Sequence, residues 1–154
     1  MASRLVKLLQ KAHAGEIAAA CAYEGHWRSV KDLSEKIKIQ LIQIDEIKHQ
    51  IEVLEFLNSL GARPSKIRDT VFTVIGKTLS VGCYFTGWFL PMWGALLIEQ
   101  IGVVNYEELA IEAEKEGHKE MSDKLREMGK LEKEHETYFL EKLNAGKSTT
   151  DDAG

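Results

Sequence analysis

The chain has 154 residues and a formal net charge of −4. A chain of this length buries a full hydrophobic core as one domain, without disulfides or a structural zinc, and its negative charge argues against nucleic acid as a partner. Cys21 and Cys83 form no Cys-x-x-Cys motif, which excludes a rubredoxin-type iron site. We therefore expect a reducing, cytoplasmic location.

The first half of the chain is predicted to form two long helices, over about 3–30 and 32–59. The whole sequence contains only two prolines, and apolar residues recur at helical spacing, which favours an all-α fold. Glu16 interrupts the apolar stripe of the first helix, and Glu46 and His49 interrupt that of the second. Such carboxylates and imidazoles on a core-facing stripe need a physical reason.

Two further polar residues in the first helix leave alternatives open. His13 lies close to one turn before Glu16, and Glu24 lies about two turns beyond it. Either could orient a metal ligand from outside the coordination sphere. We favour the simpler interpretation, which is a hydrogen-bonded histidine and a solvated glutamate.

The middle of the chain is strongly apolar. Residues 78–98 include no charged side chain, which by length alone would suit a transmembrane helix. Glycines and Pro91 interrupt the stretch, so we predict instead two helices, over about 66–87 and 91–116, that meet at a bend. Their outer surface is expected to expose large apolar side chains, namely Tyr84, Phe85, Trp88, Phe89, Leu90 and Trp93. Such a surface indicates peripheral membrane association, which we favour, or a homo-oligomer contact.

A last helix is predicted over about 118–143, after a break at Gly117. Its apolar stripe is interrupted by Glu132 and His135. We assign residues 1–146 to a single domain and residues 147–154 to a disordered polar tail.

Glu99 interrupts the apolar stripe of the predicted 91–116 helix in the same way, so the four interrupted stripes follow a repeated pattern. Glu16 precedes Glu46 by 30 residues, and Glu99 precedes Glu132 by 33, as a duplicated helical hairpin would give. The chain thus offers Glu plus Glu-x-x-His twice, a set typical of ferritin-like four-helix bundles with two iron or manganese ions. Four carboxylates neutralise two divalent cations, so burial of the set becomes tolerable. We predict such a bundle, with the bent apolar segment added to it.

With these residues located, the sequence resembles the demethoxyubiquinone hydroxylase family. The shared features are the opening His-Ala-Gly-Glu motif that ends at Glu16, the two Glu-x-x-His pairs, the Arg63-Pro64 pair, and Tyr106 at the spacing expected after Glu99. The similarity covers about residues 5–143. It implies a metal site made of Glu16, Glu46, His49, Glu99, Glu132 and His135, with Tyr106 as a candidate catalytic residue.

The resemblance also implies an activity. It suggests a di-iron monooxygenase that uses O2 to hydroxylate the ring of a lipophilic quinone or quinol at the membrane surface, with NADH as electron donor. Manganese accepts the same ligands, so it remains an alternative to iron. Two other classes stay open: a ferritin-like iron-oxidising, storage or peroxide-scavenging protein, and a membrane-associated bundle without metal.

Overall fold

The computed structural model describes residues 3–151, with side chains described for residues 3–146. The described chain is all-helical, as the sequence predicted. Its elements are α1 (Arg4–Ser29), α2 (Leu33–Ser59), α3 (Lys66–Gly82), α4 (Phe89–Lys115) and α5 (Lys119–Asp151).

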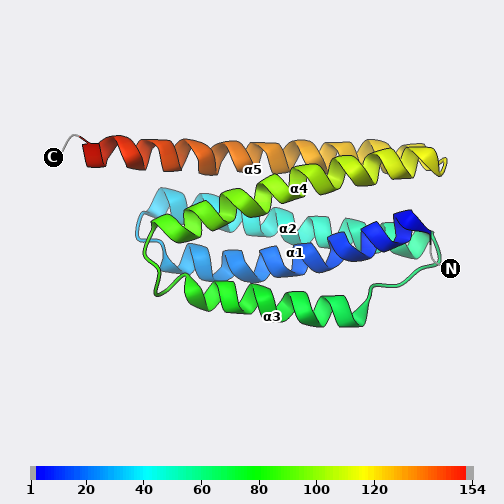
Figure 1. The fold of residues 1–154 in the computed structure, drawn as a ribbon, viewed down its shortest axis with the longest axis horizontal. Helices are drawn as coiled ribbons and strands as arrows, with labels where there is room; N and C mark the ends of the chain where they lie inside the picture. Colours follow the sequence, from blue (N-terminus) through cyan, green and yellow to red (C-terminus); the bar gives the residue numbers. More distant parts are fainter. Residues whose placement is uncertain (1–2, 152–154) are drawn as a thin grey trace.

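The helices form two hairpins and one additional helix. α1 packs along α2, α4 packs along α5, and the two hairpins face each other as a four-helix bundle (Figure 1). α3 lies on the outer side of α1, at the edge of the molecule furthest from α5 (Figure 1). α3 and α4 do not pack against each other, so a groove can open between them above α1.

Local sequence signals define the helix ends. Ser3, Asp32 and Ser65 cap α1, α2 and α3, each accepting a hydrogen bond from a backbone N–H in the first turn. Gly61 and Gly117 follow α2 and α4 with φ values of 66° and 87°, a conformation that favours glycine. Both glycines stand where the sequence predicted helix breaks.

Two predicted boundaries were wrong. α3 ends at Gly82 rather than near residue 87, because the chain turns through a short connection before α4 starts at Phe89. α5 was expected to end near Leu143 but continues to Asp151. The tail predicted to be disordered, 147–154, is therefore helical as far as Asp151, and residues 152–154 lie outside the described part of the chain.

The bundle core consists of two apolar clusters separated along the helix axes. One cluster includes Leu9 and Ala12 of α1, and the other begins at Ala19 of the same helix. On α5, Met128 belongs to the first cluster and Phe139 to the second. The layer between the two clusters is therefore enclosed by apolar side chains above and below.

The apolar segment forms an exposed surface, as predicted. The six large side chains named from the sequence are all exposed, from Trp88 at 37% to Phe85 at 82%. The surface continues along the outer faces of α3 and α4, through Val71, Val74 and Val104. Among the described residues, no helix combines the length and the apolarity that crossing a membrane requires.

We predict that Gly76→Ala destabilises the protein. A Cβ at Gly76 would lie 2.7 Å from the Cα of Ala18 on α1, which is too close for backbone atoms. The substitution should therefore push α3 away from α1 and lower the free energy of unfolding by about 1–3 kcal/mol. Chemical denaturation measures the change.

Gly82→Ala provides the matched control at the end of the same helix. A Cβ at this position would meet no atom within 4 Å. Alanine there should leave the stability unchanged or raise it slightly. Equal effects of the two substitutions would contradict close packing of α3 on α1.

Candidate metal centre

Six acidic and imidazole side chains meet in the layer between the two apolar clusters. α1 and α4 each supply one glutamate, and α2 and α5 each supply a glutamate and a histidine one turn later. All six are at most 7% exposed: Glu16, Glu46, His49, Glu99, Glu132 and His135. The structure thus brings together every residue that the sequence nominated for a metal site.

The ligand atoms form two overlapping groups, each with all atoms within 4.8 Å of one another. One group adds Glu16 and His49 to a shared pair of glutamates, and the other adds Glu99 and His135 to the same pair. The shared pair is Glu46 and Glu132. Two positions that share two carboxylates are the arrangement expected of a dinuclear site with bridging carboxylates.

Several polar atoms of this cluster lack hydrogen-bond partners. The buried Nδ1 atoms of both histidines and one carboxylate oxygen each of Glu46, Glu99 and Glu132 have none. His49 Nδ1 lies 2.7 Å from Glu132 Oε1, and His135 Nδ1 lies 3.3 Å from Glu99 Oε2, but neither contact has hydrogen-bond geometry. Buried polar atoms are rarely left unpaired, so these atoms are suited to a cation.

The cluster is costly to keep charged by itself. Burial raises the pKa of Glu16 to about 7, and burial followed by neighbouring carboxylates raises the pKa of Glu46 and Glu132 well above the ordinary value. Burial also lowers the pKa of His49 to about 4, which keeps its imidazole neutral. A neutral imidazole beside carboxylates that need positive charge fits a site for divalent metal ions.

Two tyrosines connect the hairpins across this layer. Tyr23 of α1 donates its hydroxyl hydrogen bond to Glu99 of α4, and Tyr106 of α4 donates to Glu16 of α1. Each tyrosine lies seven residues after the glutamate on its own helix and binds the glutamate of the other helix. The contacts are reciprocal, as a duplicated hairpin predicts, and they fix the orientation of both carboxylates.

A glycine makes room for one carboxylate. Gly102 lies one turn after Glu99 on α4, and a Cβ there would clash with the side-chain carboxylate of Glu132. The missing side chain therefore lets Glu132 occupy the centre of the bundle. This is a second indication that the layer is shaped around its carboxylates.

Two adjoining cavities lead from the outside to this layer. A cavity of about 260 Å³ is lined by three of the clustered glutamates, including Glu16, and by α3 and α4. A second cavity of about 560 Å³, lined almost entirely by apolar side chains, shares Leu79, Ile98 and Ile101 with the first. Together they form an apolar groove between α3 and α4 that ends at the glutamates.

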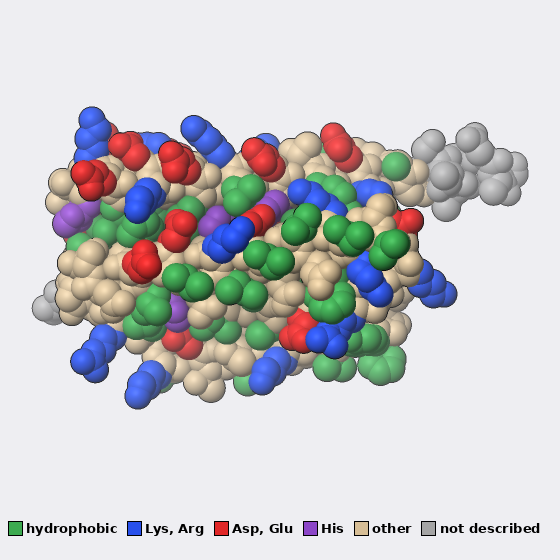
Figure 2. Space-filling view, turned by 180° about the vertical axis from the view of Figure 1, so that it is seen from behind, with side chains coloured by type: hydrophobic (Ala, Val, Ile, Leu, Met, Phe, Trp, Pro, Cys, Tyr) green, Lys and Arg blue, Asp and Glu red, His purple; other side chains and the backbone are tan. Residues whose placement is uncertain are grey.

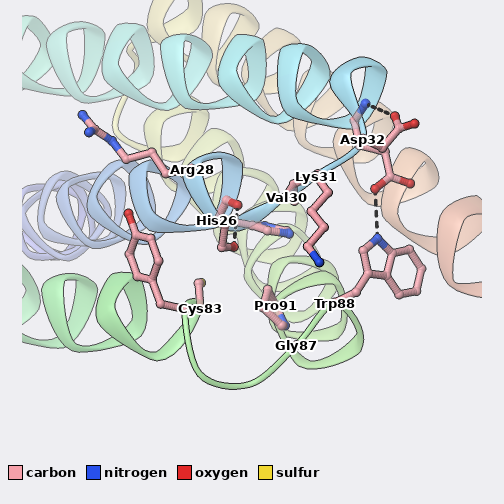
Figure 3. Close-up of a pocket in the computed structure, with 12 residues that line it drawn as sticks. His26, Arg28, Val30, Lys31, Asp32, Cys83, Gly87, Trp88 and Pro91 are labelled. Carbon is pink, nitrogen blue, oxygen red and sulfur yellow. Dashed lines mark hydrogen bonds between the residues drawn. The ribbon is translucent and has the colours of Figure 1, made fainter.

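A further cavity of about 750 Å³ lies at the end of the bundle where α1 meets α2. Figure 3 shows the His26 ring beside it, opposite Pro91 and Trp88. Trp88 donates an indole hydrogen bond of 2.9 Å to Glu35, which ties the α3–α4 connection to α2 (Figure 3). His26 and Cys83 also line the apolar groove, so this cavity adjoins it.

A comparison with known protein families identifies a family for this chain. The family model described as ubiquinone biosynthesis protein COQ7 matches residues 3–150. The chain belongs to this family. The resemblance to the demethoxyubiquinone hydroxylases is thereby confirmed, and the chain has the family's role as an enzyme of ubiquinone biosynthesis. A search of curated proteins finds no significant match.

The sequence left two interpretations open for His13 and Glu24 of this COQ7-family chain, and both residues have ordinary structural roles. His13 is buried and its Nδ1 lies 3.1 Å from Asp69 of α3, so it is a hydrogen-bonded histidine outside the cluster. Glu24 is exposed and pairs with Arg28. Both outcomes follow the simpler of the two interpretations.

Sequence reasoning missed three residues near the site. The partnership of Tyr23 with Glu99 joins positions 76 residues apart, although the equal spacing of Tyr23 and Tyr106 after their glutamates could have suggested it. Asp45 Oδ2 lies 3.5 Å from His135 Nε2, the side of that ring away from the cluster. His26, one turn after Tyr23 on the same stripe, has a buried Nε2 without a hydrogen-bond partner.

We predict that Gly102→Ala lowers metal binding by this COQ7-family chain. The added methyl group would displace the Glu132 carboxylate, so the amount of iron retained after anaerobic loading should fall severalfold while helicity is kept. Metal analysis and circular dichroism measure the two quantities. Gly94→Ala on the same helix is the control, because a Cβ there would meet nothing within 4 Å.

We also predict a pH effect on stability from His26. Burial lowers its pKa to about 4, whereas the unfolded chain keeps a value of about 6.5. As the pH falls through this window the unfolded chain binds a proton that the folded chain does not, so stability is lost, by up to about 3 kcal/mol.

His26→Phe removes this contribution. The stability of the variant relative to the natural protein should therefore rise as the pH is lowered, as measured by denaturation at about pH 8 and about pH 5. The subtraction cancels the contributions of the other titrating groups. A difference that stays constant between the two pH values would contradict the assignment.

Proposed function

We propose that this protein is a di-iron monooxygenase that hydroxylates the ring of a lipophilic quinone or quinol at a membrane surface. The single observation that carries the proposal is the position of the buried Glu and His cluster at the inner end of an apolar groove. Membership of the COQ7 family supports the same substrate class and reaction.

Each side chain has a proposed role in holding the metals. Glu16 and Glu99 would be terminal carboxylates, Glu46 and Glu132 bridging carboxylates, and the histidines one ligand for each iron. This division follows from the two overlapping groups, in which only Glu46 and Glu132 occur twice. Carboxylate and imidazole ligands also accept manganese, so the metal content has to be measured.

The protein supplies the environment for the reaction. Two ferrous ions, when bound, provide electrons for the activation of O2. Tyr23 and Tyr106 hold the terminal carboxylates through their hydroxyl groups. We therefore assign Tyr106 as a positioning residue, because its hydroxyl acts through Glu16. The two apolar clusters limit the access of water to the layer from above and below, which would protect reactive species from side reactions.

The groove suits an amphipathic substrate. Its inner part is lined by glutamates and Tyr106, where a polar ring would lie, and its outer part is lined by Leu79, Leu97 and Ile101, where an isoprenoid tail would pack. These apolar residues are also exposed at the surface. A tail could therefore extend from the groove into lipid.

The exposed apolar surface of α3 and α4 borders this groove, which supports peripheral membrane association through residues 78–98. Aromatic side chains such as Trp93 and Tyr84 are suited to the headgroup region of a bilayer. Substrate could then enter directly from the membrane. NADH remains the proposed electron donor; the sequence has no Gly-x-Gly-x-x-Gly motif, so it would bind without a Rossmann fold or act through a reductase.

Metal content is the first test. Anaerobic loading with ferrous iron followed by removal of unbound metal should leave two irons per chain. His135→Ala should abolish most of this binding with helical content kept, whereas His118→Ala, outside the cluster, should retain it. Fewer than about one iron per natural chain, or normal iron in the His135 variant, would refute the di-metal site.

Turnover is the second test and separates an oxygenase from an iron-storage protein. The iron-loaded protein should consume O2 only when a quinol analogue and a reductant are present, and mass spectrometry should find one added oxygen atom in the ring. Ferritin-like storage would instead give many irons per subunit and iron oxidation independent of quinol. That result would overturn the proposed reaction while leaving the metal ligands intact.

A further inference from the structure

α2 carries an apolar stripe on the face that points away from the bundle. Its members are each 42–67% exposed, and we call them the α2 stripe: Leu33, Ile37, Leu41, Ile44, Ile47 and Ile51. They follow one another at three- and four-residue intervals and so lie on one side of the helix. Figure 2 shows apolar side chains in a row across this face, with charged side chains on both sides.

This stripe is separate from the metal layer and from the groove. Glu46 and His49 are on the opposite, buried face of the same helix. Within the described residues α2 packs along α1 and approaches α5 at only a few positions, and nothing covers its outer face. Six large aliphatic side chains in one row are unusual on the surface of a monomer and mark an interaction site.

The stripe has an internal symmetry. Leu41 and Ile47 lie three residues before and after Ile44, and Ile37 and Ile51 lie seven residues before and after it. An antiparallel copy of α2, centred on Ile44, would therefore place apolar side chains opposite apolar side chains along the whole stripe. This is the pattern required of a two-fold interface, in which the same patch is used by both subunits.

The charges that flank the stripe favour the same orientation. Lys36 lies eight residues before Ile44 and Glu52 lies eight residues after it. In the middle, Lys48 pairs with Asp45 of the same helix at 2.8 Å. An antiparallel pair centred on Ile44 would place Lys36 of one copy opposite Glu52 of the other, whereas a parallel pair would place Lys36 opposite Lys36 and Glu52 opposite Glu52.

We propose that the α2 stripe is the interface of a homodimer, in which α2 of one protomer packs antiparallel against α2 of its partner about a two-fold axis at Ile44. Both protomers keep the groove between α3 and α4 free, because its outer part is lined by α1, α3, α4 and the α3–α4 connection and not by α2. The pairing would also support α2, the helix that supplies Glu46 and His49, from its otherwise uncovered side. It does not require bound metal.

The first experiment measures the oligomeric state of the full chain in detergent-free buffer at micromolar concentration. Light scattering after size-exclusion chromatography should give the mass of a dimer. Ile37→Asp and Ile44→Asp should each raise the dimer dissociation constant at least about tenfold with helicity and melting behaviour kept. Ile111→Asp, at a similarly exposed apolar residue of α4, is the matched control and should leave the dimer intact.

The second experiment tests the two-fold axis. With Cys21 and Cys83 replaced by serine, Ile44→Cys should form a disulfide between protomers when oxidised glutathione is added, because only residues at the axis approach their own copies closely enough. Ile111→Cys should not. The cysteine variant introduces no charge into the α2 stripe. The crosslinking experiment therefore stays informative if an aspartate variant fails to fold.

The third experiment tests the orientation. Lys36→Glu should weaken the dimer, as should Glu52→Lys, and the combination of the two changes should restore it. A monomeric natural protein would overturn the proposal. So would a dimer that is unaffected by the changes at Ile37 and Ile44, or stripe variants that lose only binding to lipid vesicles.

Discussion

The structure depends on the burial of four carboxylates in one layer of the bundle core. A buried carboxylate without a partner is costly, and burial lowers the pKa of the neighbouring His49 to about 4, so this imidazole is neutral and supplies no positive charge. Two divalent cations would balance the charge, and the unpartnered oxygen and nitrogen atoms converge where such ions would lie. The layer therefore destabilises the fold by itself and would stabilise it if metal ions were bound.

The remaining features of the centre follow from the duplicated hairpin. Each hairpin contributes one glutamate, one Glu-x-x-His pair and one tyrosine, and each tyrosine binds a glutamate of the other hairpin. The two halves are thus connected through the site rather than only through their apolar clusters. α2 and α5 approach each other at few positions, and the contacts of His49 with Glu132 (2.7 Å) and of His135 with Glu46 (3.6 Å) contribute to their connection.

The molecule divides its apolar surfaces between different uses. The groove between α3 and α4 continues to the glutamates and is bordered by exposed aromatic residues, which is consistent with a lipophilic substrate. The α2 stripe is narrow, symmetric and flanked by charges of both signs, which is consistent with a second protein copy. The core-facing apolar residues of α1, α2, α4 and α5 form the two clusters that cover the site from above and below.

The sequence by itself determined the all-α class, all five helix starts to within two residues, and the six acidic and imidazole residues of the buried cluster. It could do so because helical periodicity and the Glu-x-x-His spacing are local properties, and because the duplication makes each half a check on the other. The family resemblance was also carried by local motifs. The prediction that α5 ends near residue 143 was wrong, because no proline follows Leu143 and the helix continues through Asn144 and Gly146 to Asp151.

Only the tertiary structure decided which partners meet. The hydrogen bonds of Tyr23 and Tyr106, the space that Gly102 leaves for Glu132, and the place of His26 beside two cavities depend on the packing of separate helices. The exposure of the α2 stripe was also decided by the tertiary structure, because a stripe of isoleucines in a sequence is equally compatible with a buried helix face. Which of the two faces of α2 is buried was settled by α1, because only one face can pack against it while the other remains free.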